Sequence, residues 1–77
     1  MDIHEFIDKF AAQFDDTERC EFTPETAFRK DLKEWSSITA LSVIAMIDIE
    51  YSVKVSGDDL ARCITVKDVY DIVNTKK

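Results

Sequence analysis

Glycine and proline are almost absent from this sequence, which has one of each in 77 residues. A fold rich in β-strands needs these residues at its many turns, and a disordered linker is usually rich in them. Both possibilities are therefore disfavoured. The length allows one small domain and no more. We expect a single all-α domain that spans residues 1–77.

Residues that commonly carry metal sites or nucleophilic catalysis are also scarce. The two cysteines, Cys20 and Cys63, form no CxxC pair, and His4 is the one histidine. These residues do not supply a zinc site at any usual spacing, and no nucleophile lies beside a base. The adjacent acids Asp58 and Asp59 are typical of a solvated helix cap. The sequence predicts neither an enzyme nor a metal site.

The sequence has no long apolar run and no excess of positive charge. Its longest apolar stretch, Val43 to Ile47, is far shorter than a membrane-spanning helix requires. Sixteen acidic residues against ten basic ones give a net charge of −6, which would repel a nucleic-acid backbone. No basic segment followed by an apolar stretch opens the chain. We expect a monomeric cytoplasmic protein that neither enters membranes nor binds nucleic acids.

Apolar spacing predicts three main helices and one short helix. The first helix should start near Asp2 and fade around residues 15–17, and the second should run from Ser36 or Ser37 to about Tyr51. A short element is expected over residues 58–62. The last helix should follow Thr65, an N-cap whose capping box uses Asp68. The second helix has a broad apolar face formed by Ile38, Leu41, Ile44, Ala45 and either Met46 or Ile47.

Two connections complete this predicted helical bundle. The long first connection, residues 15–35, carries the isolated apolar residues Phe22, Phe28 and Leu32, which we expect to hold it against the core. Pro24 is placed to start a helical turn over residues 25–28. Residues 52–56 alternate polar and apolar side chains, but no second strand is available to pair with them. We therefore expect an extended connector there.

A serine pair stands where the first connection meets the second helix. Taken alone, Ser36 and Ser37 are most simply read as helix caps. The wider pattern resembles the acyl carrier protein family over nearly the whole chain. The matching segments are Phe28-x-x-Asp31-Leu32, Ser36-Ser37-Ile38, Tyr51, Val53-Lys54-Val55 and Ile64-Thr65-Val66-x-Asp68-Val69.

The resemblance implies that Ser37 receives 4′-phosphopantetheine from coenzyme A through a phosphopantetheinyl transferase. Ser36 replaces the aspartate usual in the family and would serve as the helix cap, while Ile38 replaces a leucine. The implied function is a carrier that holds acyl, aminoacyl or polyketide intermediates as thioesters. It would receive them from acyl-loading enzymes and deliver them to synthases. The alternative is an interaction module that has kept the fold and lost the arm.

The second helix departs from the family at its outward positions. Family members usually present acidic residues there, whereas this sequence has Thr39, Ser42 and Ile49. This difference favours a specialised carrier over a general fatty-acid carrier. Partner docking is expected to use apolar side chains, namely Ile38, Leu41, Met46 and Ile49. Ile49 is expected either on the surface or beneath the connector that follows the helix.

Overall fold

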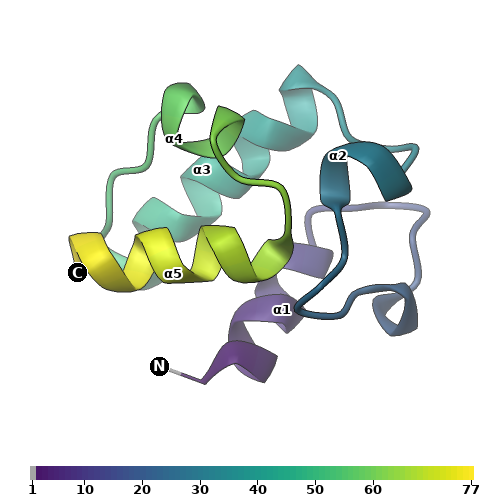
Figure 1. Ribbon diagram of the computed structural model, residues 1–77, viewed down its shortest axis with the longest axis horizontal. Coiled ribbons are helices and arrows are strands. Elements are labelled where there is room, and N and C mark those ends of the chain that lie inside the picture. Colours follow the sequence, from purple (N-terminus) through teal and green to yellow (C-terminus); the bar gives the residue numbers. More distant parts are fainter. Residues whose placement is uncertain (1) are drawn as a thin grey trace.

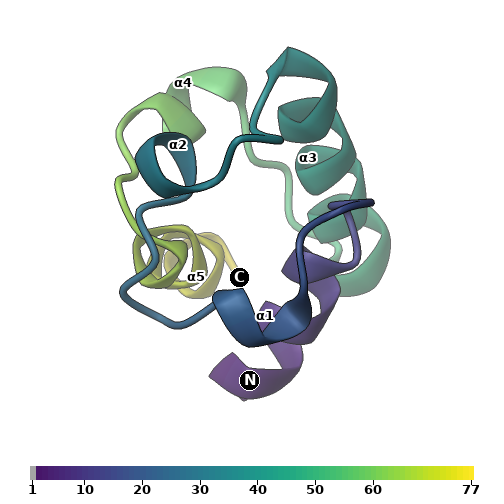
Figure 2. The same ribbon diagram turned by 90° about the vertical axis from the view of Figure 1, so that its right-hand side faces the viewer.

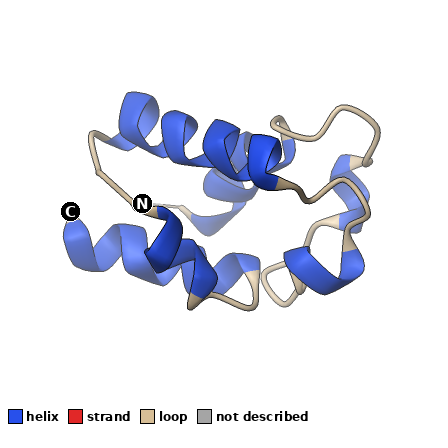
Figure 3. Cartoon of the chain, turned by 90° about the horizontal axis from the view of Figure 1, so that it is seen from above, coloured by secondary structure: helices blue, strands red, loops and turns tan. Residues whose placement is uncertain are grey.

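The computed structural model describes residues 2–77, and in that range it contains helices and loops but no strand (Figure 3). Three helices are long: α1 (Ile3–Ala11), α3 (Ser37–Tyr51) and α5 (Val66–Lys76). Helix α4 (Gly57–Ala61) is the predicted short one. The first connection holds a 3₁₀ turn, η1 (Arg19–Glu21), and a further short helix, α2 (Phe28–Asp31). The all-α prediction is confirmed.

Helix α1 lies at the base of the molecule and packs against both α3 and α5 (Figures 1 and 2). Figure 2 shows α3 and α5 on opposite sides, with the first connection passing between their ends. Helix α4 packs against α3. None of the helices between residues 3 and 76 combines the length and the apolar character that crossing a bilayer would need.

Short-range capping chemistry sets the starts of the later helices. Ser36 is the N-cap of α3, and its Oγ accepts a hydrogen bond from the Thr39 N–H at 3.3 Å. Thr65 and Asp68 form the predicted capping box of α5. Residues 52–56 form the predicted connector without helix or strand, although its first residue, Ser52, is left-handed; Ser56 is extended and caps α4. These boundaries were predictable because each cap and its helix are neighbours in the sequence.

Two boundaries in the first half were predicted wrongly. Helix α1 ends at Ala11 rather than near Asp15, because the chain turns there and brings Phe14 back into the core. The short helix of the connection starts at Phe28 rather than after Pro24. The carbonyl oxygens of Pro24 and Thr26 instead accept hydrogen bonds from the first amides of α5, at 3.0 and 3.1 Å. This tie to α5 fixes residues 24–26 in a turn.

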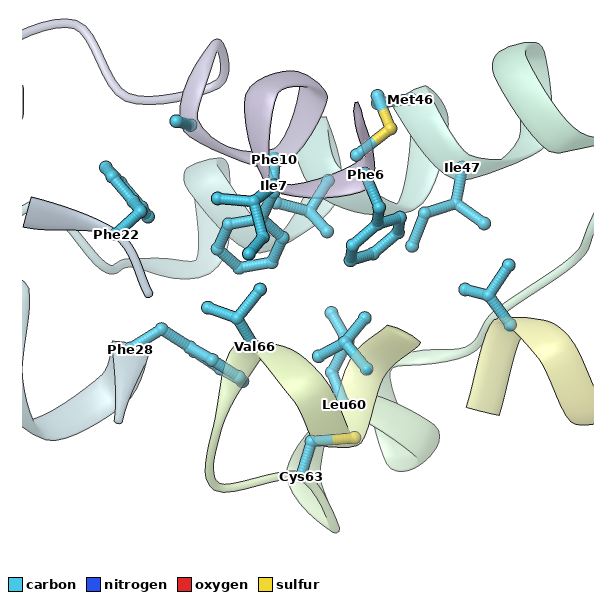
Figure 4. Close-up of a cluster of buried hydrophobic side chains, with 14 of the residues drawn as sticks. Phe6, Ile7, Phe10, Phe22, Phe28, Met46, Ile47, Leu60, Cys63 and Val66 are labelled. Atoms are coloured by element: carbon cyan, nitrogen blue, oxygen red, sulfur yellow. The ribbon is translucent and has the colours of Figure 1, made fainter. Parts of the chain in front are cut away.

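The core is centred on aromatic rings from α1 and the first connection (Figure 4). Phe6, Phe10 and Phe28 are completely buried, and Phe22 and Leu32 hold the connection against the core as predicted. The guanidinium of Arg29 adds a polar tie, since it donates to the carbonyls of Leu60 and Cys63 at 2.6 and 2.9 Å. The long connection is thus anchored at both the α1 and the α4–α5 sides.

The orientation of α3 differs from the prediction. Val43, Met46 and Ile47 face the core, whereas Ile38 and Leu41 remain 76% and 65% exposed. The helix is apolar on opposite sides, so periodicity could not show which side packs inward. The packing against α1 and α4 decides it.

Ser52 ends α3 in a left-handed conformation, with φ 56° and ψ 38°. This region is strained for a residue with a Cβ atom, whereas glycine adopts it freely. We expect Ser52→Gly to raise the free energy of unfolding by about 0.5–1 kcal/mol, measured by urea denaturation. Ser56→Gly is the matched control, because Ser56 has an extended backbone and its side chain caps α4. A loss of stability in Ser52→Gly equal to that in Ser56→Gly would contradict the prediction.

Candidate functional site

Ser37 is the first residue of α3, and its side chain is exposed. Its hydroxyl forms no hydrogen bond with residues 2–77, because Ser36 already supplies the cap. At a helix N-terminus the first amides also lack acceptors within the helix, and the helix dipole favours negative charge there. The two serines therefore have separate roles: Ser36 closes the helix end, and Ser37 presents a free hydroxyl beside it.

Aromatic packing fixes the segment immediately before this serine pair. The Trp35 ring lies 4.5 Å from that of Phe28 and 6.5 Å from that of Phe10, measured between centroids. The Trp35 N–H donates to the Leu32 carbonyl at 3.2 Å. Thr39 extends the support into α3, since its hydroxyl donates to the Glu34 carbonyl at 2.8 Å. Ser37 thus directly follows a segment that aromatic packing and hydrogen bonds hold in place.

The Glu34 carboxylate joins the segment before Ser37 to the start of the first connection. It accepts hydrogen bonds from the N–H groups of Asp15 and Asp16 at 3.0 and 2.8 Å, and from the Thr17 hydroxyl. The Thr17 hydrogen bond is the main cause that lowers the pKa of Glu34, and the two amides add to it. Sequence reasoning missed Glu34, because its partners lie 17 to 19 residues away in the chain.

The exposed side of α3 continues from Ser37 as an apolar surface. We call Ile38, Leu41, Ala45 and Ile49 the outer face of α3; all four are exposed. Ile49 is 78% exposed, so it does not lie beneath the following connector.

One predicted docking residue does not belong to this outer face. Met46 is only 7% exposed and packs in the core, because it lies nearer the side of α3 that meets α1. Met46 was predicted to take part in partner docking, and the structure instead places most of its side chain in the core.

The acidic residues near the outer face are engaged in ion pairs. Asp48 pairs with Lys54 at 2.9 Å, and Glu50 pairs with Lys9 at 3.0 Å. Helix α3 itself contains no lysine or arginine. These pairs are solvent-exposed, so each contributes little to stability. They leave the outer face with little uncompensated charge.

A hollow of about 370 Å³ lies within the first connection, lined by Asp16, Thr17, Glu21, Asp31, Leu32, Lys33 and Glu34. Three of its carboxylates accept hydrogen bonds within the fold: Glu34 as described above, Glu21 from the Glu18 N–H, and Asp31 from the Ala27 N–H. Over residues 2–77, no three His, Cys, Asp or Glu side chains are grouped so that they could hold a metal ion.

The two cysteines are not part of the segment that holds the serine pair. Cys63 is buried, its Sγ donates to the Asp59 carbonyl at 3.3 Å, and burial raises the pKa of its thiol to about 11. It is therefore protonated and unreactive near neutral pH. Cys20 lies exposed in η1, and both thiols are free.

Comparison with known proteins adds no further identification. No family model matches the chain, and no solved structure matches it. The resemblance to acyl carrier proteins therefore depends on the sequence segments alone.

The Glu34 contacts predict a specific acid sensitivity. A carboxyl whose pKa falls on folding contributes stability that is complete above its ordinary value of 4.5 and is lost as the pH falls through the folded-state pKa. Between about pH 6 and about pH 3, we therefore expect Glu34→Gln to lose less stability than the unmodified protein. Urea denaturation across this range measures the difference.

Glu25→Gln provides the control for that measurement. Glu25 is exposed and forms no hydrogen bond or ion pair with residues 2–77. Its variant should follow the unmodified protein at every pH. Identical pH profiles for Glu34→Gln and Glu25→Gln would show that the Glu34 contacts do not contribute.

Proposed function

We propose that the protein is a carrier with a 4′-phosphopantetheine arm on Ser37. One observation carries the proposal: Ser37 presents an exposed hydroxyl, without a hydrogen bond to any of the described residues 2–77, at the start of a 15-residue helix, while Ser36 independently caps that helix. A serine required as the cap would be poorly placed for modification. Here the two tasks fall on different residues.

The residues around Ser37 fit an attached phosphodiester. The first amides of α3 can donate to anionic oxygens, and the positive end of the helix dipole favours their charge. In the transfer, Ser37 Oγ would form a bond to the coenzyme A phosphorus that is attached to pantetheine, and would lose its proton to a base on the transferase. The bond from that phosphorus to the bridging pyrophosphate oxygen would break, and adenosine 3′,5′-bisphosphate would leave. The arm supplies a terminal thiol for acyl, aminoacyl or polyketide cargo.

The outer face of α3 suits the second task of a carrier, which is to meet several enzymes in turn. Ile38 and Leu41 adjoin Ser37 and are exposed, so they would contact the transferase, the acyl-loading enzyme and the synthase. Ile49 extends the surface along the helix. Apolar contacts of this kind depend weakly on salt. The carrier would act as a cytoplasmic monomer.

A second candidate function is an interaction module without an arm. The observation that favours it is the outer face itself, which exposes large apolar side chains whether or not Ser37 is modified. The presence of Ser36, where carriers usually have aspartate, points in the same direction. Modification of Ser37 separates the two functions.

Intact mass spectrometry tests the carrier directly, after incubation with coenzyme A and a broad-specificity phosphopantetheinyl transferase. We expect the unmodified protein to gain one phosphopantetheine and Ser37→Ala to gain none. Ser37→Ala keeps the cap and should fold normally, which circular dichroism would verify.

Two variants at Ser36 complete the experiment. Ser36→Asp keeps a strong cap and introduces the usual carrier residue, so it should be modified at least as completely as the unmodified protein. Ser36→Ala loses the cap, costing about 0.5–2 kcal/mol of stability, but should still be modified. Modification lost in both Ser36 variants but kept in Ser37→Ala would place the attachment on Ser36. No mass gain in any folded variant would refute the carrier and leave the interaction module.

A further inference from the structure

Residues 33–36 lead into α3 and determine where Ser37 lies, but few backbone hydrogen bonds hold them. The Trp35 N–H donates to the Leu32 carbonyl, and the Ser36 carbonyl accepts the first intrahelical hydrogen bond of α3. In the described part of the chain, this segment makes no other backbone–backbone hydrogen bond. A segment with so few backbone bonds opens locally at low cost. Its conformation therefore depends on side-chain contacts.

Glu34 connects this segment to two separate parts of the fold. Its carboxylate accepts hydrogen bonds from the Asp15 and Asp16 N–H groups, at 3.0 and 2.8 Å, and from the Thr17 hydroxyl. Its carbonyl oxygen accepts from the Thr39 hydroxyl at 2.8 Å. One residue is thus bonded to the start of the first connection through its side chain and to the first turn of α3 through its backbone.

Trp35 supports the same segment in a different way. Its ring lies 4.5 Å from the Phe28 ring and 6.3 Å from the Phe14 ring, measured between centroids. Apolar packing is non-directional, so it keeps the ring buried without fixing the rotation of the backbone on either side. Hydrogen bonds to a carboxylate are directional and stronger than neutral ones. Glu34 is therefore the residue that fixes the orientation of the backbone before Ser37.

We propose that Glu34 is a positioning residue for the attachment of phosphopantetheine to Ser37, an inference that rests on the proposed function. Glu34 acts through residues 33–36 rather than on the reacting atoms. It keeps this segment in the conformation in which the transferase meets Ser37. When a binding-competent conformation is only partly populated, the apparent affinity falls by that fraction. Loss of the Glu34 contacts should therefore raise the KM of the transferase for this protein and leave kcat unchanged.

Steady-state kinetics with the full-length protein as the varied substrate measure both constants, with the product followed by intact mass. Glu34→Gln keeps the size of the side chain and removes its charge, and it should raise KM about fivefold with the same kcat. Thr17→Val removes one donor to the carboxylate and should raise KM by a smaller factor. The double variant should resemble Glu34→Gln, because both changes break the same contact.

Two controls separate positioning from a general loss of stability or charge. Thr65→Ala removes the N-cap of α5 and so destabilises the fold outside residues 33–36. Glu25→Gln removes a charge from a side chain without a hydrogen bond or ion pair in the described residues. Both variants should keep the KM of the unmodified protein. An equal rise of KM in Thr65→Ala and Glu34→Gln would overturn the proposal.

Amide hydrogen exchange tests the physical basis in protein without an arm. In Glu34→Gln the amides of Asp15, Asp16 and Trp35 should exchange faster, because the contact that holds the two segments together is weakened. The amides of Val69 and Val73, which are completely buried in α5, should keep their rates. Unchanged exchange at Asp15, Asp16 and Trp35 would contradict the inference.

The kinetic result also distinguishes this inference from the proposed function. If the unmodified protein gains no phosphopantetheine, the carrier function is refuted and the positioning role falls with it. If it is modified and Glu34→Gln has an unchanged KM, the carrier function stands and the positioning role alone is overturned. A fall in kcat without a rise in KM would also overturn it, since Glu34 would then affect a step after binding.

Discussion

The ring of Phe10 contacts five other aromatic side chains, with centroid distances from 5.6 to 6.5 Å, and the placement of the serine pair depends on it. These rings come from α1, from both ends of the long connection and from α2; they are Phe6, Phe14, Phe22, Phe28 and Trp35. A domain of this size buries too little surface to fix every loop by burial alone. Concentrating the rings at one point lets a single buried side chain hold a connection of some twenty residues. Ser36 and Ser37 directly follow Trp35, so the packing of the Trp35 ring also fixes where the serine pair lies.

The aromatic cluster also explains why α3 is free on one side. The cluster fills the space between α1 and the connection, and α3 closes it with only Val43, Met46 and Ile47 fully turned inward. A helix that is apolar all round is normally buried on all sides. Here the opposite side remains in water, with Ile38, Leu41 and Ile49 exposed. The outer face of α3 is therefore an exposed apolar surface next to the Ser37 hydroxyl. A helix with a purely structural role does not require this arrangement.

Local chemistry made part of the fold predictable from the sequence. The start of α3 and the capping box of α5 depend on residues within three positions of one another, and both were predicted correctly. The orientation of α3 was not, because its two apolar sides are equivalent until the neighbouring helices are placed. Glu34 was missed for a related reason: its carboxylate acts on residues far away in the chain. The early end of α1 and the late start of α2 likewise follow from tertiary contacts of Phe14, Pro24 and Thr26.

The division of roles between Ser36 and Ser37 constrains the function more than either residue alone. If Ser37 were the cap, its hydroxyl would be held against the Thr39 or Ala40 amide, and modification would cost the helix its first contact. Because Ser36 makes that contact, a group attached to Ser37 leaves the cap, the Thr39–Glu34 hydrogen bond and the Trp35 packing intact. A carrier must keep the same fold with and without its arm, since different enzymes recognise both forms. A serine at the first position of a helix that a different residue caps meets this requirement.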